Sequence, residues 1–178
     1  NFDLLNAWSS HAGPNAWPDA DMLPLGRISL DDRPHGPERM TNFTLPEQYT
    51  LLTLWTIARS PLMIGADLLS LDQQTLSLLT NPEVISVNQK STDNRQVVQR
   101  NGSSVWVATD PDSGDKFIAL FNLKEKEAEV TFELELENLR GKYLVRDLWA
   151  KSDLGQIELM LSAQLPPHGA GLFRLKKL

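Results

Sequence analysis

The sequence contains no cysteine and only three histidines, and both scarcities limit its chemistry. A chain without cysteine forms no disulfide, no zinc–thiolate site and no cysteine nucleophile, although this leaves its cellular compartment open. The histidines, His11, His35 and His168, are not spaced as ligand pairs on one helix or strand. We therefore expect neither a metal site nor any other cofactor.

Long apolar runs and clusters of positive charge are also missing. No run of about 18 or more apolar residues occurs, so we expect no membrane-spanning helix. The net charge is −6, and no cationic cluster is longer than the pair Lys176–Lys177, which argues against nucleic acid or an anionic membrane as a partner. The first residue is Asn1 and no signal-peptide pattern follows it, so we expect a processed or excised chain of a soluble bacterial protein, exported or cytoplasmic.

The first half of the chain carries helix signals. Thr44 and Glu47 form a capping box, and the apolar residues that follow recur at helical spacing, which predicts a helix over 44–60. A second helix is expected over 70–80. Between them, the short apolar run LMIGADL at 62–68 predicts a buried strand. Helix, buried strand and helix in this order are typical of a parallel α/β unit.

The second half changes to a period of two. Val130, Phe132, Leu134 and Leu136 alternate with polar residues, which predicts a half-buried strand. Turn residues separate several further short apolar segments, and six to eight strands at this spacing predict an antiparallel sandwich. We expect the two parts to be residues 1–90 and 91–178, with Trp106 and Trp149 buried in the sandwich. The other predicted strands are SSVWVATD, DKFIALFN, KYLVRDLWA, QIELMLS and GAGLFRLKK.

The segment NAWPDADML, residues 15–23, places Asp19 and Asp21 two positions apart beside Trp17. A solvated turn or a helix cap would account for these residue types. So would a sugar pocket, because carboxylates accept hydrogen bonds from hydroxyl groups and apolar side chains pack against the CH faces of a sugar ring. The residues alone leave both alternatives open.

Several separate blocks of the sequence resemble the C-terminal part of glycoside hydrolase family 27, the α-galactosidase and α-N-acetylgalactosaminidase family. The resemblance covers nearly the whole chain and implies the end of a (β/α)8 barrel followed by an antiparallel β-sandwich. We therefore expect the fold class to be an α/β barrel remnant, with its last strands and helices, followed by an all-β antiparallel sandwich. The blocks are, in order, AGPNAWPDADMLPLG, EQYTLLTLWTIARSPLMIGADL, LLTNPEVISVNQ, VWVA with FIALFN, and VRDLW.

The resemblance also assigns a role to the first of these blocks. Asp21 and Met22 match family positions that line the galactose pocket, and Trp17 and Asp19 belong to the same loop as its scaffold. The commonest family form of this loop is Trp-Asn-Asp-Pro-Asp-Met, so Asn and Pro are replaced here while both carboxylates and the methionine are kept. These four residues are the candidate substrate-binding residues, with an α-galactoside or a related oligosaccharide as the ligand.

No catalytic residue is expected in this chain. Retaining glycosidases use two carboxylates about 5–5.5 Å apart, and the resemblance locates both upstream of Asn1. Asp19 and Asp21 alternate along an extended loop, so their side chains would tend to diverge and are poor candidates for the pair. The resemblance thus implies an α-galactosidase-like hydrolase whose activity requires residues outside this chain, and the chain alone is expected to be inactive.

Several alternatives stay open at this stage. We interpret Asp31, Asp32 and Glu38 as solvated loop residues, with a role in shaping the pocket rim as the alternative. Asp19, Asp21 and Asp31 have the ligand type for calcium without its usual spacing. A non-catalytic β-sandwich module, for packing or carbohydrate contact, is the alternative function. Because at most the segment near 10–16 is available to pair with 62–68, we expect residues 1–90 to be completed by the missing barrel portion, by a symmetric partner or by helices repacked on the sandwich.

Overall fold

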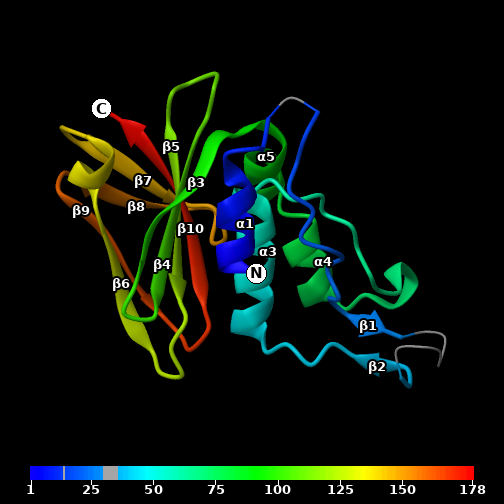
Figure 1. Cartoon of the computed structure of the whole chain (residues 1–178). Coiled ribbons are helices and arrows are strands. Elements are labelled where there is room, and N and C mark those ends of the chain that lie inside the picture. The colour runs from blue at the N-terminus through cyan, green and yellow to red at the C-terminus, as the bar shows by residue number, and fades with distance from the viewer. Residues whose placement is uncertain (14, 30–35) are drawn as a thin grey trace.

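The computed structural model of the protein describes residues 1–13, 15–29 and 36–178 (Figure 1). The sandwich forms one side of the molecule in this view, and the helices and the β1–β2 hairpin lie beside it. The first half contains α1 (Phe2–Ser9), β1 (Arg27–Ile28), β2 (Arg39–Met40), α3 (Leu45–Ile57), the 3₁₀ turn η1 (Leu68–Ser70), α4 (Gln73–Leu79) and α5 (Pro82–Lys90). The second half contains β3 (Thr92–Arg100), β4 (Ser103–Thr109), β5 (Lys116–Asn122), β6 (Ala128–Glu133), the 3₁₀ turn η2 (Leu134–Glu137), β7 (Tyr143–Asp147), β8 (Ser152–Ile157), β9 (Met160–Leu165) and β10 (Ala170–Lys177).

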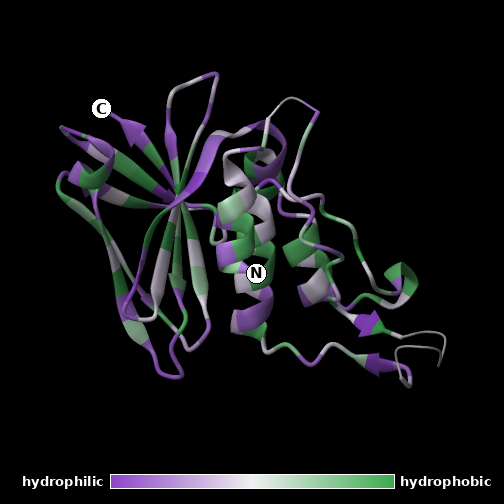
Figure 2. Cartoon of the chain, viewed as in Figure 1, coloured by the Kyte–Doolittle hydropathy of each residue, from purple (hydrophilic) through white to green (hydrophobic). Residues whose placement is uncertain are grey.

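The second half is the predicted antiparallel sandwich. Six strands form one sheet in the order β3-β4-β5-β10-β7-β8, and β6 pairs with β9 in a two-stranded sheet. One face of the large sheet packs against β6 and β9, as the shared core of Val105, Val107, Phe132 and Leu161 shows. Buried and exposed residues alternate along β6, which has one face in this core and the other in solvent. Figure 2 shows the hydropathy of the residues along the sandwich strands.

The opposite face of the large sheet packs against α3. Trp106 and Phe121 from the sheet share a core with Leu52 and Leu54 of α3, so this core joins the two halves of the chain. The middle of β4 and β5 is therefore buried on both faces, which explains why these segments are nearly continuous hydrophobic runs.

Three details of the sandwich differ from the sequence-based predictions. The strand expected to run through Leu136 ends at Glu133 and continues as η2, and Leu136 is 52% exposed. Asn138 then adopts a left-handed conformation that ends this turn. The segment QIELMLS is not one strand, because the chain bends at Glu158 and Leu159 and passes from β8 in the large sheet to β9 in the two-stranded sheet. The polar segment 92–100 forms the edge strand β3, which hydrophobic periodicity did not reveal.

The two tryptophans occupy different environments. Trp106 is fully buried, as predicted. Trp149 is partly buried, but it lies in the turn after β7 rather than on a strand. Its indole Nε1 donates a hydrogen bond of 2.9 Å to Oγ1 of Thr53 on α3, and its ring meets Tyr49 edge to face. Trp149 therefore joins the sandwich to the helix.

The capping box of α3 is confirmed. The backbone nitrogen of Thr44 donates to Oε2 of Glu47 at 2.7 Å, and the helix runs over Leu45–Ile57. This interaction also lowers the pKa of Glu47, because the backbone and side chain of Thr44 both donate to its carboxylate. The later helices begin with side-chain caps as well, Asp72 for α4 and Asn81 for α5.

The segment 62–68 does not form the expected buried strand. It makes one parallel bridge, between Leu23 and Ile64, and Met63 is 62% exposed. Its partner is the segment from Leu23 to Arg27 rather than residues 10–16, where Gly13 and Ala16 form a bridge with each other. In the part of the chain that the structure describes, 62–68 has this one neighbour, so its other edge is open.

The described helices include none that is long and apolar enough to span a membrane.

A charged contact fixes α5 to the sandwich. Arg146 on β7 donates from Nε and Nη2 to the two carboxylate oxygens of Glu83, at 2.7 and 2.8 Å, and also pairs with Asp153. This two-point geometry is the favourable one for an arginine–carboxylate pair. The hydrogen bonds from Arg146 hold the pKa of Glu83 below its usual value.

We expect Glu83→Gln to lower the free energy of unfolding at neutral pH by about 1 kcal/mol, because both partners are partly exposed and solvent screens the pair. A carboxylate whose folded pKa is depressed contributes stability above its unfolded pKa, and this contribution is lost as the pH falls through the folded pKa. The difference between the two proteins should therefore shrink below about pH 4. Urea unfolding at several pH values measures it, and a difference independent of pH would contradict this account.

Candidate functional site

The loop Trp17–Met22 forms one wall of an open hollow of about 570 Å³. The opposite wall is α1, which contributes Leu4, Leu5 and Trp8. Trp17, Asp19, Asp21 and Met22 are all exposed, so the structure brings the four sequence-predicted residues together on one accessible loop. The hollow itself is lined by the first three of them, together with Asn1, Pro18 and Ala20.

Hydrogen bonds within the loop set its conformation. Asp19 Oδ1 accepts from the backbone nitrogen of Asp21 at 2.9 Å, and Asp21 Oδ1 accepts from the backbone nitrogen of Met22 at 2.7 Å. Asp21 has a φ of 77°, a left-handed conformation that is uncommon for a residue other than glycine. Residues held in this way cluster at binding and catalytic sites, which makes Asp21 a candidate on geometric grounds as well.

Trp17 and Met22, the two apolar candidate residues of the loop, contact residues of the segment 59–65. The guanidinium carbon of Arg59 lies 6.0 Å from the centre of the Trp17 ring, at the limit of a cation–π contact. Met22 packs against Gly65, where an added Cβ would lie 3.1 Å from the Met22 Cβ. Glycine at this position therefore permits the close approach of the loop to the segment 62–68.

Of the remaining acidic candidates, the structure describes Glu38, which does not line the hollow. Glu38 forms an ion pair of 2.9 Å with Arg27 on the β1–β2 hairpin. Asp31 and Asp32 lie outside the described residues. Among the described residues, no group of three or more histidine, aspartate or glutamate side chains is arranged to hold a metal ion. The chemistry of the loop is that of a polar binding wall: exposed carboxylates that accept hydrogen bonds, next to indole and thioether surfaces.

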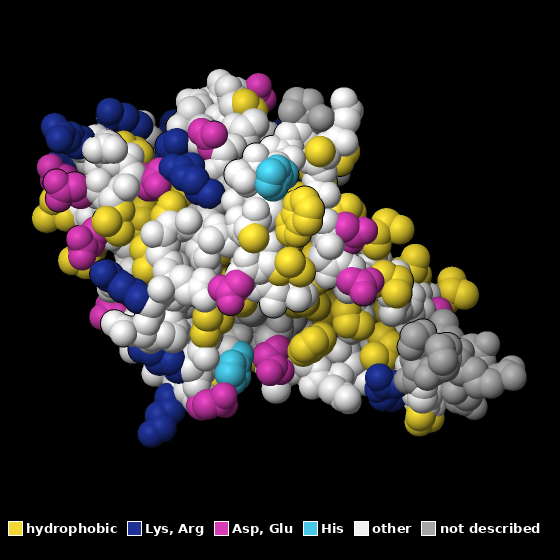
Figure 3. All heavy atoms as spheres, viewed as in Figure 1, with side chains coloured by type: hydrophobic (Ala, Val, Ile, Leu, Met, Phe, Trp, Pro, Cys, Tyr) yellow, Lys and Arg dark blue, Asp and Glu magenta, His cyan; other side chains and the backbone are white. Residues whose placement is uncertain are grey.

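The hollow belongs to a larger open apolar face, which we define by Leu4, Trp8, Trp17, Met22, Met63 and Ile64. These side chains are between 38% and 62% exposed. Figure 3 shows hydrophobic side chains gathered over this half of the molecule, with carboxylates among them. An exposed apolar face of this extent is typical of an interaction surface.

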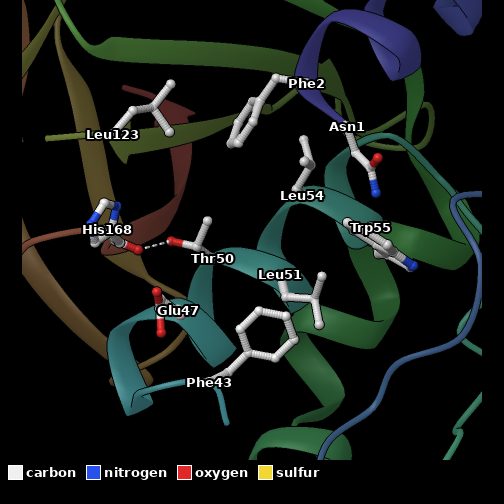
Figure 4. A pocket seen from close by; sticks show the side chains of 10 residues that line it. All are labelled: Asn1, Phe2, Phe43, Glu47, Thr50, Leu51, Leu54, Trp55, Leu123 and His168. Atoms are coloured by element: carbon white, nitrogen blue, oxygen red, sulfur yellow. Dashed lines mark hydrogen bonds between the residues drawn. The ribbon is translucent and has the colours of Figure 1, made fainter. Parts of the chain in front are cut away.

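A second cavity, of about 260 Å³, lies where α1 and α3 meet two turns of the sandwich (Figure 4). Its lining is largely apolar, with Phe2, Leu51 and Leu123 among its residues. At one end Thr50 Oγ1 donates to the backbone oxygen of His168 at 2.6 Å. Trp55 borders this cavity, and its indole nitrogen points away from the other lining residues.

The indole nitrogen of Trp55 contacts the candidate loop, and the sequence did not indicate this contact. Trp55 Nε1 donates to the backbone oxygen of Asp21 at 2.7 Å, and Oγ of Ser60 accepts from the backbone nitrogen of Ala20 at 2.9 Å. Both residues read as ordinary helix-core and helix-end positions in the sequence. No spacing signal could have revealed contacts between segments about 40 residues apart in the chain.

Two protein-family models match the chain, one in each half. Residues 3–90 match the model described as alpha galactosidase A, and residues 100–175 match that of the alpha galactosidase C-terminal beta sandwich domain. Among curated relatives, an alpha-galactosidase of Oryza sativa is 33% identical over 97% of this chain and 39% of its own length. Alpha-galactosidase 2 of Arabidopsis thaliana is 31% identical over 98% of this chain and 42% of its own length.

A solved structure matches still more closely. The GH27 β-L-arabinopyranosidase of Geobacillus stearothermophilus is 44% identical and superposes with a TM-score of 0.94, covering 98% of this chain and 40% of that one. The chain therefore spans about two fifths of the length of these relatives. The solved relatives combine a (β/α)8 barrel with a C-terminal β-sandwich, so the described fold is the end of such a barrel followed by the sandwich.

Proposed function

The chain belongs to glycoside hydrolase family 27, and from this we propose that it is the C-terminal portion of a retaining glycoside hydrolase acting on terminal α-galactosides. On this proposal residues 1–90 are the end of the catalytic barrel and residues 91–178 are its β-sandwich domain. The nucleophile and the acid/base lie in the barrel portion that precedes the chain in its relatives. The chain supplies part of the sugar pocket and none of the catalytic pair.

The observation that carries this proposal is the conformation of the loop Trp17–Met22. Asp21 is exposed and its backbone has a left-handed conformation. It lies in the same loop as Met22 and Trp17, at the edge of an open hollow. A carboxylate next to apolar surface suits a galactose-like ring, which presents hydroxyl groups on its rim and CH groups on one face. We propose that Asp21 and Met22 contact the sugar and that Trp17 and Asp19 support the loop.

A β-L-arabinopyranoside is the second candidate substrate. It is favoured by the 44% identity to the Geobacillus β-L-arabinopyranosidase, which exceeds the identity to the plant α-galactosidases. The two sugars have the same ring configuration, and β-L-arabinopyranose lacks the exocyclic hydroxymethyl group of α-D-galactopyranose. The residues of this loop suit the ring that both sugars share.

We also propose that the partner of the open apolar face is the remaining portion of the barrel. Leu23 and Ile64 form the beginning of a parallel sheet with an open edge, and the exposed Met22 and Met63 flank this bridge. In a closed barrel each such strand has a neighbour on both sides and helices cover its outer face. A homo-oligomer that covers the same face is the alternative partner.

The test is to translate the DNA upstream of the Asn1 codon and to express the protein it encodes beside residues 1–178 alone. We expect a barrel upstream, turnover of nitrophenyl α-galactoside or β-L-arabinopyranoside by the longer protein, and no turnover by the chain alone. The reason is that loss of the nucleophile and the proton donor removes the chemistry itself. If no barrel is encoded, or if the longer protein cleaves neither substrate, the alternative of a non-catalytic β-sandwich module is favoured instead.

A further inference from the structure

We infer that Trp55 and Ser60 are positioning residues that clamp the backbone on either side of Asp21 and so aim its carboxylate at the hollow. The inference rests on the proposed function, because it assigns a purpose to the loop that contains Asp21. It concerns side chains that do not touch the sugar on that proposal.

The clamp consists of two hydrogen bonds that bracket the backbone between the nitrogen of Ala20 and the carbonyl oxygen of Asp21. Ser60 Oγ accepts from the nitrogen of Ala20 at 2.9 Å, and Trp55 Nε1 donates to the backbone oxygen of Asp21 at 2.7 Å. The ψ rotation of Ala20 and the φ and ψ rotations of Asp21 lie between these two fixed groups. With both groups held, the φ of Asp21 can leave its left-handed value of 77° only if the other two rotations change in compensation or one of the bonds breaks, so the clamp favours the observed conformation.

The two clamping side chains are themselves rigid. Ser60 is fully buried and Trp55 is 3% exposed, with its ring in the core that α3 shares with the sandwich. Asn88 of α5 donates from Nδ2 to the backbone oxygen of Ser60 at 2.8 Å. Asn94, at the start of the sandwich, donates to the backbone oxygen of Ile57 at 2.7 Å. The end of α3 is thus tied to both α5 and β3.

Arg59 adds a third attachment at the same place. It has a φ of 57°, and its Nε and Nη2 donate to the backbone oxygens of Asn88 and Gln89 at the end of α5. Its guanidinium is thereby held beside the Trp17 ring. The end of α3 therefore holds the loop at Trp17, Ala20 and Asp21, while the Asp21 side chain is left exposed.

The clamp is tested first on the 178-residue chain, with the variants Ser60→Ala and Trp55→Phe. Each has a matched control in the sandwich or at its seam. Ser104 is a fully buried serine that accepts from Gln96 Nε2 at 2.8 Å, and Trp149 donates from Nε1 to Thr53. The controls Ser104→Ala and Trp149→Phe therefore remove the same atoms and one hydrogen bond each, away from the loop.

The readouts are amide hydrogen exchange at Ala20 and the amide chemical shifts of Asp21 and Met22, measured by NMR next to the unfolding free energy. We expect exchange at Ala20 to accelerate by about tenfold in Ser60→Ala, and the Asp21 and Met22 shifts to move in both clamp variants. The controls should leave these signals in place at a similar loss of stability. Unchanged signals in Ser60→Ala, which removes one oxygen and is the milder variant, would overturn the inference.

The second readout uses the longer protein with its barrel. Because the clamp orients a binding carboxylate while the catalytic pair lies elsewhere, we expect Ser60→Ala to raise KM for the cleaved nitrophenyl glycoside by about tenfold and to change kcat much less. Unaltered KM in a variant whose Asp21 signals have moved would overturn the positioning role. Absence of turnover by the unmodified longer protein would instead overturn the proposed function and leave the exchange experiment as the test of the clamp.

Discussion

Trp106→Ala is expected to destabilise the chain by about 3–5 kcal/mol, the largest stability effect of any single substitution we consider. Trp106 is a fully buried residue of β4, and its ring lies in the core between the large sheet and α3. Its removal would leave a cavity where the two halves of the chain meet. Since small domains have a total stability of about 5–15 kcal/mol, this loss is a large fraction of the whole.

The substitution Trp106→Phe tests whether the volume of the ring or its polar Nε1 group determines the contribution of Trp106 to stability. Among the described residues, the buried Nε1 of Trp106 has no hydrogen-bond partner. An unpaired buried donor costs about 1–3 kcal/mol, so Trp106→Phe removes an unfavourable group together with part of the ring. We expect it to cost much less than Trp106→Ala, by urea unfolding followed with circular dichroism. Trp8→Ala, at a residue that is 54% exposed, is the matched control, and an equal loss there would contradict the argument.

The position of Trp106 also shows why its strand could be predicted from the sequence. Residues of β4 alternate between the two cores, with Val105 and Val107 on one side and Trp106 and Ala108 on the other. A strand covered on both faces is apolar throughout and is bounded by turn residues, a pattern that is visible in the sequence. The α3 capping box is local in the same sense, because Thr44 and Glu47 are three residues apart.

The strand predictions that were wrong depended on contacts between segments far apart in the sequence. The segment 62–68 is apolar enough for a buried strand, yet a strand of a closed barrel is paired on both edges, and the described chain supplies one neighbour, at Leu23. The alternation of apolar and polar residues predicts a strand through Leu136, but the backbone N–H of Leu134 donates to the backbone oxygen of Leu159 and the chain turns into η2. Hydrophobic periodicity indicates which side chains can be buried. It does not indicate where the hydrogen bonds between paired strands end.

The candidate site also has residues that the sequence predicts and residues that the structure adds. Asp19, Asp21, Met22 and Trp17 were found through a resemblance of motif, and the structure adds the left-handed φ of Asp21. Trp55 and Ser60, which hold that loop, come from a helix and its end more than 30 residues away. Their hydrogen bonds end on backbone atoms, so no particular side-chain type in the loop reveals them in the sequence.

This geometry gives the second large prediction, which concerns Asp21 itself. In the longer protein, Asp21→Asn is expected to lower kcat/KM by about 10- to 150-fold, which corresponds to the loss of a hydrogen bond to a charged group worth about 1.5–3 kcal/mol. Asparagine tolerates the left-handed conformation and can still accept from the Met22 nitrogen. The loop should therefore keep its shape, and the loss reports on the charge alone.

Two further variants separate the carboxylate from the backbone. Asp21→Gly is compatible with a φ of 77°, whereas Asp21→Ala is strained there by about 1–2 kcal/mol. Both lose the hydrogen bond from the Met22 nitrogen and should lose activity at least as strongly as Asp21→Asn, while the added strain should make Asp21→Ala the variant with the lower melting temperature. Asp19→Asn keeps an oxygen that accepts from the Asp21 nitrogen, so we expect a much smaller effect on kcat/KM. Activity that follows melting temperature across these four variants, instead of following the presence of the Asp21 carboxylate, would show that Asp21 supports the fold and does not bind the sugar.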